Sequence, residues 1–387
     1  MNHFDTSKKP EDIKQNMQDI IVDTTGISWV DGDNGRLFYR GINIAELAAH
    51  ASFEETAWLL LVGKLPDKIK LDAFSWGLRN MSSSQEKIIR IIKEFPQHSK
   101  PLLILQTALA ALASIDRNEN YLEEENFIEK VMRIIAQTPV VLSAAYRHYL
   151  GVPLLEPRSD LSFVENFIYM LFGKIPTKNQ SRCMEIALII QMDHGFTPST
   201  FIARSVASTQ TNFYSATSAA VGALTGNLHG GTSALVIELI KNAKNSGNVK
   251  NYIYNLLNSG GKVVGMGHRI YKTMDPRAII FKDLLSQLTS KDEKENDFNI
   301  LLEIEQVARK YFEEKMLPIY ANVDLWSGAV YKKLGIQPVL YSAIFAAARI
   351  VGWCAHILEL RQSNKIYYPE SEYVGFKDIP YVPLEQR

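Results

Sequence analysis

The chain has 387 residues, of which 46% are hydrophobic and 22% are charged, so it is long enough to bury a large core and to form two or three domains. Lysine and arginine together number 42, as do aspartate and glutamate, so the formal net charge is zero. This balance argues against a nucleic-acid or membrane-surface partner, because both attract an excess of positive charge. Any anionic ligand is therefore expected to be bound by local arginines.

The N-terminus and the cysteines indicate a reducing compartment. Residues 1–18 are polar and of mixed charge, and they lack the apolar stretch of a secretory signal. Cys183 and Cys354 lie among apolar residues without metal-ligand spacing, so we predict two small core side chains and no metal site. We therefore expect a cytoplasmic protein.

A short β-hairpin is predicted near the N-terminus. Residues 27–30 and 37–40 are rich in apolar and aromatic side chains, and they flank the turn-rich segment 31–35. Other strand signals are few.

Helical patterns dominate the rest of the chain. Ser52 and Glu55 form a capping box ahead of an apolar run that Gly63 ends, and the same order of signals recurs from Ser162 to Gly173. Further helices are predicted at 102–114, 125–137, 138–149, 181–192, 215–224, 232–244, 276–288, 298–315 and 326–334. Residues 290–296 are predicted to form a solvated loop. The fold class is therefore all-α.

Residues 341–360 form an apolar run long enough to cross a membrane. Arg349 and His356 lie inside it, and an arginine at the centre of a bilayer costs at least ~2.5 kcal/mol. We therefore predict a buried helix that carries one functional arginine, and no membrane span.

The first segment with chemical potential is 226–231, which places His229 among glycines. Thr232 is a plausible N-cap of the next helix, so His229 would lie just ahead of a helix N-terminus, where the dipole disfavours the imidazolium. A neutral imidazole can donate a hydrogen bond to an enolate oxygen. The alternative is a glycine-rich turn with an incidental histidine.

The second segment, 262–277, carries His268 next to two glycines. Gly265 and Gly267 frame a loop tight enough to lie against a flat or phosphorylated ligand, although the segment lacks the dinucleotide-binding fingerprint. Arg277 falls in the first turn of a predicted helix, where a cation is unfavourable unless it binds an anion.

The third segment, 321–328, places Asp324 just before a helix, where it is either a functional carboxylate or a simple cap. One carboxylate, two histidines and several arginines together form an acid–base and anion-binding set. Such a set suits proton abstraction next to a carbonyl.

In their order and spacing, these three segments closely resemble the active-site segments of citrate synthases. Other stretches resemble the same family, namely 36–41, 52–66, 165–173, 199–204 and 348–353. The resemblance runs from about residue 20 to the C-terminus, and the short length is similar to the dimeric bacterial and archaeal type, which includes 2-methylcitrate synthases.

The resemblance implies a role for each catalytic residue. Asp324 would remove a proton from the acyl-CoA, His229 would stabilise the enol or enolate, and His268 would hydrogen-bond the ketone of a 2-oxo acid. The residues implied to hold the carboxylates of oxaloacetate are His194, Arg277 and Arg349. Those implied to bind CoA are Lys262, Gly265 and Gly267.

The resemblance also implies a homodimer in which a small domain, 232–335, is inserted into a large domain formed by 1–231 and 336–387. Acyl-CoA and the 2-oxo acid would be small-molecule substrates, and no cofactor is implied because the CoA thioester is itself a substrate.

The sequence departs from the family near the substrate. Tyr368 stands where an arginine is expected, Glu370 stands where a basic residue is common, and residues 232–234 differ from the usual Ala-Asn-Glu. Three interpretations stay open: a citrate or 2-methylcitrate synthase, an enzyme of the family with a different 2-oxo acid, and a non-catalytic homologue that binds CoA or organic acids.

Overall fold

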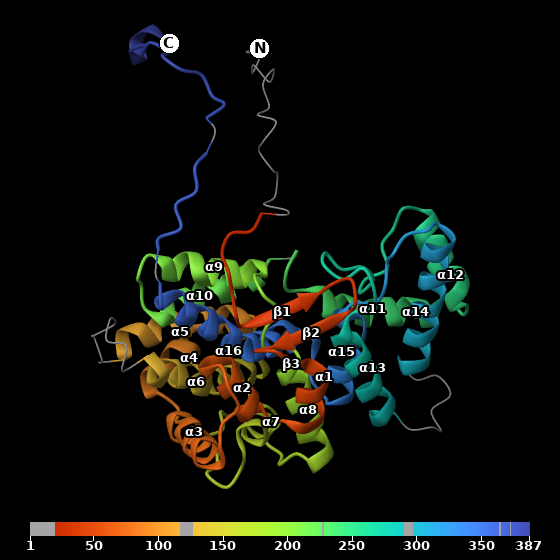
Figure 1. The fold of residues 1–387 in the computed structure, drawn as a ribbon, viewed down its shortest axis with the longest axis horizontal. Helices are drawn as coiled ribbons and strands as arrows, with labels where there is room; N and C mark the ends of the chain where they lie inside the picture. Colours follow the sequence, from red (N-terminus) through yellow and green to blue (C-terminus); the bar gives the residue numbers. More distant parts are fainter. Residues whose placement is uncertain (1–19, 117–126, 227, 290–296, 364, 372) are drawn as a thin grey trace. The chain divides into compact units, whose positions relative to one another are not determined.

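The computed structural model describes residues 20–387 except 117–126, 227, 290–296, 364 and 372. The predicted loop at 290–296 and residues 1–18 therefore lie outside the described residues. The described chain contains sixteen α-helices and one small sheet, which confirms the all-α prediction (Figure 1). It divides into two units, one formed by Thr25–Lys365 and a small one formed by both chain ends.

The predicted N-terminal hairpin is confirmed. Strands β1 (Ser28–Asp31) and β2 (Arg36–Tyr39) pair antiparallel, and an unpredicted short strand, β3 (Ile42–Asn43), pairs with β2. The Asp31 carboxylate closes the turn by accepting hydrogen bonds from Asn34 and Arg36. This contact ties the turn to the start of β2.

Ten helices precede residue 225, and both predicted capping boxes are present among them. Ser52 with Glu55 and Ser162 with Glu165 satisfy free N–H groups at helix N-termini. The ten are α1 (Ile44–His50), α2 (Phe53–Val62), α3 (Lys68–Met81), α4 (Glu86–Glu94), α5 (Pro101–Ile115), α6 (Phe127–Leu150), α7 (Phe163–Phe172), α8 (Lys178–Ile189), α9 (Pro198–Ser208) and α10 (Phe213–Leu224). The sequence analysis missed α1, α3, α4 and α9, which are short or mostly polar.

The predicted break between helices 125–137 and 138–149 is wrong, because α6 continues through Pro139. The side-chain hydroxyl of Thr138 donates to the carbonyl of Ile134 at 2.7 Å, and every residue from 134 to 146 is buried. Packing on all sides therefore holds the helix together despite the backbone N–H that proline lacks.

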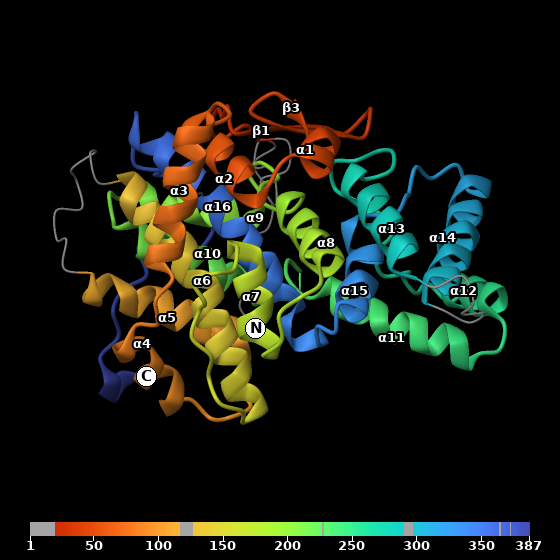
Figure 2. The ribbon, with the colours of Figure 1, turned by 90° about the horizontal axis from the view of Figure 1, so that it is seen from below.

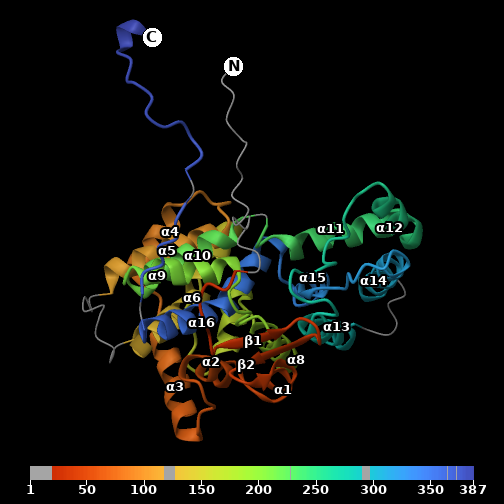
Figure 3. The ribbon, with the colours of Figure 1, turned by 45° about the horizontal axis from the view of Figure 1, so that its top comes forward.

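Helix α16 (Tyr341–Arg361), preceded by the 3-10 turn η3 (Pro338–Leu340), forms the centre of the large helical assembly. It packs against α2, α6, α9 and α10, and Figures 1 and 3 show α5, α9, α10 and α16 lying together. By length and composition Pro338–Arg361 could cross a membrane, but 83% of its most apolar window is buried inside the protein. The prediction of a buried helix that carries Arg349 is confirmed, since this side chain is 1% exposed.

Five helices lie between residues 232 and 333, and Figure 2 shows them together on one side. They are α11 (Thr232–Asn245), α12 (Val249–Asn258), α13 (Pro276–Leu288), α14 (Asp297–Glu314) and α15 (Val323–Lys333). Asp297 of α14 forms ion pairs with Lys244 of α11 at 2.8 Å and with Lys332 of α15 at 2.7 Å, and so joins these three helices. The predicted small domain, 232–335, would consist of these helices, and its boundaries stay a prediction.

Two details differ from the sequence analysis here. Helix α12 was not predicted, and the N-cap of α11 is Gly231, so Thr232 is the first helical residue and not the cap. Gly231 takes this place because a glycine is tolerated at an N-cap even without a side-chain hydrogen bond.

The second unit contains residues 20–24 and Ile366–Arg387. The Tyr367 hydroxyl donates to the Asp23 carboxylate at 2.7 Å, and the chain ends in the 3-10 turn η4 (Leu384–Gln386). Large apolar side chains of this segment are exposed, among them Ile366, Val374, Ile379 and Leu384.

Candidate active site

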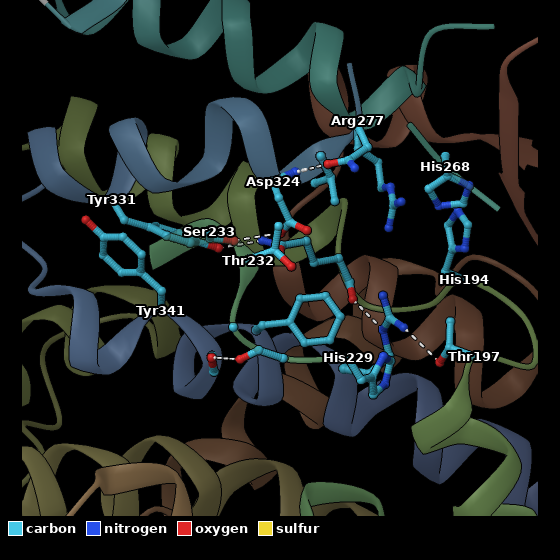
Figure 4. A pocket seen from close by; sticks show the side chains of 18 residues that line it. His194, Thr197, His229, Thr232, Ser233, His268, Arg277, Asp324, Tyr331 and Tyr341 are labelled. Carbon is cyan, nitrogen blue, oxygen red and sulfur yellow. Dashed lines mark hydrogen bonds between the residues drawn. The ribbon is translucent and has the colours of Figure 1, made fainter. Parts of the chain in front are cut away.

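One pocket brings together all six residues predicted to act in catalysis or to bind the 2-oxo acid (Figure 4). Arg277, Asp324 and Arg349 lie on helices, whereas the three histidines lie on loops, and the cavity that the six residues share has a volume of about 170 Å³. Its lining includes Gln191, His194, Thr197, His229, Ser233, His268, Arg277, Asp324, Tyr331, Tyr341, Phe345 and Arg349. Residues separated by up to 158 positions in the sequence thus meet at one site.

The imidazole of His229 is fixed as a neutral donor. Its Nε2 accepts the backbone N–H of Ser199 at 3.3 Å and lies 2.8 Å from the Ser199 hydroxyl, which in turn accepts from the Trp353 indole. Because Nε2 faces a backbone donor, the ring proton must be on Nδ1.

Burial, and then the charge of Arg349, lower the pKa of His229 to about 4. This direction agrees with the neutral state expected from the sequence, but its causes differ from the helix dipole proposed there. The backbone donor that fixes the ring belongs to the start of α9 and not to α11.

His268 is fixed in the same way with the opposite nitrogen. Its Nδ1 accepts the backbone N–H groups of Ile270 at 3.0 Å and Tyr271 at 3.2 Å, so a neutral ring carries its proton on Nε2. Burial and the nearby Arg277 lower the pKa of His268 to about 4. Its imidazole can therefore donate one hydrogen bond into the pocket.

His194 lies beside His268, with ring centroids 5.3 Å apart, and its Nε2 is 3.1 Å from the Tyr271 hydroxyl. Burial, and then Arg277, hold the pKa of His194 well below its usual value. Figure 4 shows this pair of histidines next to Arg277, away from His229.

Asp324 is the second residue of α15 and is not its cap. Asn322 caps the helix by accepting the Asp324 backbone N–H, so the interpretation of Asp324 as a simple cap is wrong. Its Oδ1 accepts a hydrogen bond from the Ser233 hydroxyl at 2.6 Å. Burial raises the pKa of the Asp324 carboxyl above its usual range, which favours a carboxylate that takes up a proton.

Arg277 is held by the N-cap of its own helix. Its Nε and Nη2 donate to the two oxygens of Asp275 at 3.0 and 2.8 Å, and both side chains are buried. Although burial lowers the pKa of Arg277, the Asp275 carboxylate raises it further, so the guanidinium stays charged. The ion pair explains how a cation is tolerated in the first turn of α13.

Arg349 has donor capacity left inside the pocket. Its Nε donates to the Gln191 carbonyl at 2.8 Å and its Nη1 to the Thr197 hydroxyl at 3.4 Å, whereas its buried Nη2 has no hydrogen-bond partner among the described residues. A buried guanidinium with a free N–H is costly unless a ligand accepts from it. This geometry favours an anionic ligand beside Arg349.

The three residues predicted to bind CoA do not line this pocket. Lys262 is exposed. Gly265 accepts the backbone N–H of Asn322 at 2.9 Å, and Gly267 donates to the carbonyl of Tyr320 at 2.7 Å. These glycines hold their loop against the segment that leads to Asp324, and their contact with CoA stays a prediction.

Several residues of the pocket were not singled out from the sequence. Ser233 in the wall of the pocket orients Asp324, and Ser199 behind the pocket orients His229. Gln191 accepts from Arg349 Nε with its backbone carbonyl, and its side-chain amide donates to the Tyr331 hydroxyl at 2.5 Å. Serine and glutamine occur in many structural roles, so their presence in a sequence does not indicate a functional site. Only Ser233 was marked in the sequence, because it lies in the unusual stretch 232–234.

The arrangement offers a carboxylate base, two neutral imidazole donors and two guanidinium groups. Among the described residues, no group of three or more His, Cys, Asp or Glu side chains is placed to hold a metal ion. A base next to fixed neutral donors can remove a proton beside a carbonyl and stabilise the resulting oxyanion. The pocket therefore has the groups of an acid–base enzyme that acts on anionic carbonyl compounds.

Comparisons with known proteins agree with this class. The family profile described as "Citrate synthase, C-terminal domain" matches residues 16–370. The citrate synthase of Synechocystis sp. is 36% identical over 388 aligned residues, which cover 100% of this chain and 96% of that protein. The chain belongs to the citrate synthase family.

Solved structures lead to the same family. The crystal structure of citrate synthase from Pyrobaculum aerophilum matches with a TM-score of 0.90 and 34% identity over 96% of this chain and 94% of that chain. The citrate synthase of Thermoplasma acidophilum, in a ternary complex with carboxymethyl coenzyme A and oxaloacetate, matches with a TM-score of 0.90 and 30% identity over 97% of this chain and 99% of that chain. The resemblance predicted from the sequence is thus confirmed.

Proposed function

We propose that the chain condenses an acyl-CoA, acetyl-CoA or propionyl-CoA, with oxaloacetate to give citrate or 2-methylcitrate and free CoA. The observation that carries this proposal is the convergence of Asp324, His229 and His268 in one pocket with two guanidinium groups. Family membership over the full chain supports the same reaction.

The first step forms the nucleophile. The Asp324 carboxylate removes a proton from the carbon next to the thioester carbonyl, while the Nδ1–H of His229 donates to the carbonyl oxygen as negative charge develops there. The raised pKa of Asp324 brings its basicity closer to neutral pH. Each positioned donor of this kind contributes about 10²–10³-fold to the rate.

The second step forms the carbon–carbon bond. The Nε2–H of His268 donates to the ketone oxygen of the 2-oxo acid and protonates it as the enol carbon attacks. Water then hydrolyses the CoA thioester of the product, and the release of CoA makes the overall reaction irreversible.

Two guanidinium groups favour a dicarboxylate as the acceptor. The unpartnered Nη2 of Arg349 suits one carboxylate, and Arg277 and His194 lie near His268, where the rest of the acceptor would be held. Oxaloacetate has one carboxylate on each side of its ketone, one attached directly and the other through a methylene group. A 2-oxo acid with one carboxylate would leave one of these two guanidinium groups without a carboxylate of the acceptor.

We also propose a cytoplasmic homodimer without a prosthetic group. Exposed apolar side chains in Ile366–Arg387 support the assembly, because clusters of this kind are commonly covered by a partner. Proton abstraction and carbonyl activation need only the side chains of the pocket, which supports the absence of a cofactor.

The test is CoA release, followed with a thiol reagent, from acetyl-CoA and propionyl-CoA against oxaloacetate, pyruvate and 2-oxoglutarate. We expect turnover with oxaloacetate. Release only with another 2-oxo acid would mean that the departures at Tyr368 and Glu370 changed the acceptor. Binding of CoA without release from any pair would identify a non-catalytic homologue and would contradict the proposal.

A further inference from the structure

Two serines lie in a row behind the carboxylate of Asp324. The Ser327 hydroxyl donates to the Ser233 oxygen at 3.1 Å, and the Ser233 hydroxyl donates to Asp324 Oδ1 at 2.6 Å. Because Ser327 occupies the acceptor side of Ser233, the single hydroxyl proton of Ser233 is directed to Asp324. Oδ1 is thus engaged, which leaves Oδ2 as the oxygen that can take the substrate proton.

This row depends on the close approach of two helices. Ser233 is the second residue of α11, and both Asp324 and Ser327 belong to the first turns of α15. Gly328 permits the contact, because a Cβ at this position would lie 2.4 Å from the backbone oxygen of Ser233. Figure 4 shows Ser233 next to Asp324 on the wall of the pocket.

Other charged or titratable groups act on Asp324 from neighbouring elements. Arg277 and its partner Asp275, at the start of α13, act in opposite directions on the carboxylate. Tyr331 lies about two turns further along α15. His229 and His268 complete the pocket as neutral rings above pH about 4. The Ser233 hydrogen bond is the largest of the influences that favour the charged form of Asp324.

We propose that Ser233 is a positioning residue for the catalytic base, with Ser327 orienting its hydroxyl. The inference rests on the proposed function. It assigns a role to a residue in the stretch 232–234, which departs from the Ala-Asn-Glu that the resemblance leads one to expect.

The experiment compares pH profiles of kcat/KM for wild type, S233A, S233T and S327A. S233A removes a hydrogen bond that stabilises the carboxylate, so the acidic limb should move upward by about one pH unit, which is roughly a tenfold loss at pH values on the acidic limb of both proteins. The KM for oxaloacetate should stay the same. S233T keeps the hydroxyl, so its acidic limb should lie at the same pH as that of wild type. S327A should shift the acidic limb upward, as S233A does, but by a smaller amount.

A second readout follows the proton transfer itself. With trideuterated acetyl-CoA, the kinetic isotope effect on kcat/KM should be larger for S233A than for wild type, because a poorly held base makes proton abstraction more rate-limiting. The matched control is S246A. Ser246 lies at the other end of α11, where its hydroxyl donates to the Ala243 carbonyl at 2.7 Å, so its removal should leave both readouts unchanged.

The outcomes separate two failures. If wild type turns over but the acidic limb and isotope effect of S233A match those of wild type, the positioning role is overturned. An equal shift in S246A would also overturn it, because the effect would then be a general loosening of α11. If wild type itself releases no CoA, the proposed function is wrong, and the result says nothing against the hydrogen bonds that connect Ser327, Ser233 and Asp324.

Discussion

The histidines of the pocket owe their chemistry to backbone groups. At His229 the N–H of Ser199, and at His268 the N–H groups of Ile270 and Tyr271, select which ring nitrogen keeps the proton. A backbone donor cannot rotate away, so the tautomer is set before any substrate arrives. This preorganisation avoids reorganisation cost during the reaction.

The same arrangement predicts the pH dependence of both rings. Their pKa values are lowered to about 4, so both stay neutral as the pH falls through the usual histidine range and gain a proton only near pH 4. We expect the ring resonances of His229 and His268 in NMR titrations to stay constant between about pH 5.5 and 8. H229Q and H268Q would assign the signals, and a ring that titrates near pH 6.5 would contradict the expectation.

At Asp324, substitution by asparagine removes the negative charge but keeps the size and shape of the side chain. D324N keeps an oxygen that accepts from Ser233 but cannot take up a proton, so kcat should fall by roughly 10²–10⁴-fold. Oxaloacetate affinity, measured by calorimetry, and the unfolding midpoint should change little. Near-normal kcat in D324N would show that another group is the base.

At the scale of elements, the site is built from helix N-termini. Ser199, Ser233, Arg277 and Asp324 are each the second residue of a helix, namely α9, α11, α13 and α15. Free N–H groups and the positive end of the dipole make such termini suited to anions. Four of them around one pocket favour the carboxylates and the developing enolate of the proposed reaction.

The contact between α16 and the loop that carries His194 should be sensitive to a single methyl group. A Cβ at Gly352 would lie 2.2 Å from the backbone oxygen of Met192 and 2.6 Å from Asp193 Oδ1. We expect G352A to lower the free energy of unfolding by about 1–3 kcal/mol, because backbone must move to make room. Denaturant unfolding measures the change.

The control for this substitution is G26A, since a Cβ at Gly26 would meet its nearest neighbours at 3.5 and 3.8 Å, which is ordinary contact. If G352A were as stable as wild type, then α16 and the loop would not be packed as tightly as the structure has them. A weaker affinity for oxaloacetate should accompany the loss of stability, because the displaced loop carries His194.

At the scale of the whole molecule, the proposed assembly can be measured directly. Light scattering of the full chain should give twice the chain mass of 43.7 kDa. Ile379 is 67% exposed in the C-terminal segment, and I379D should weaken the dimer by placing a charge in an apolar contact. I379V is the control that keeps the contact apolar. A monomeric wild type would contradict the assembly.

Much of this protein can be determined from the sequence because the signals are local. Capping boxes, a helix-ending glycine and apolar periodicity involve residues a few positions apart, and they gave α2, α7 and the central α16 correctly. The three motif segments supplied His229, His268 and Asp324, since glycines and helix starts around a titratable residue are visible in the chain itself.

Tertiary structure decided what depends on long-range contacts. Helix α6 continues through Pro139 because its surroundings bury it, and Thr232 is not the cap because Gly231 takes that place. The proton position on His229 and the serine behind Asp324 require groups from other helices. The proton position on His268 and the ion pair of Arg277 involve near neighbours in the chain, but they depend on the folded geometry of the loop and of the helix start. Sequence determines which groups a protein has, whereas burial and distance determine their charge and direction.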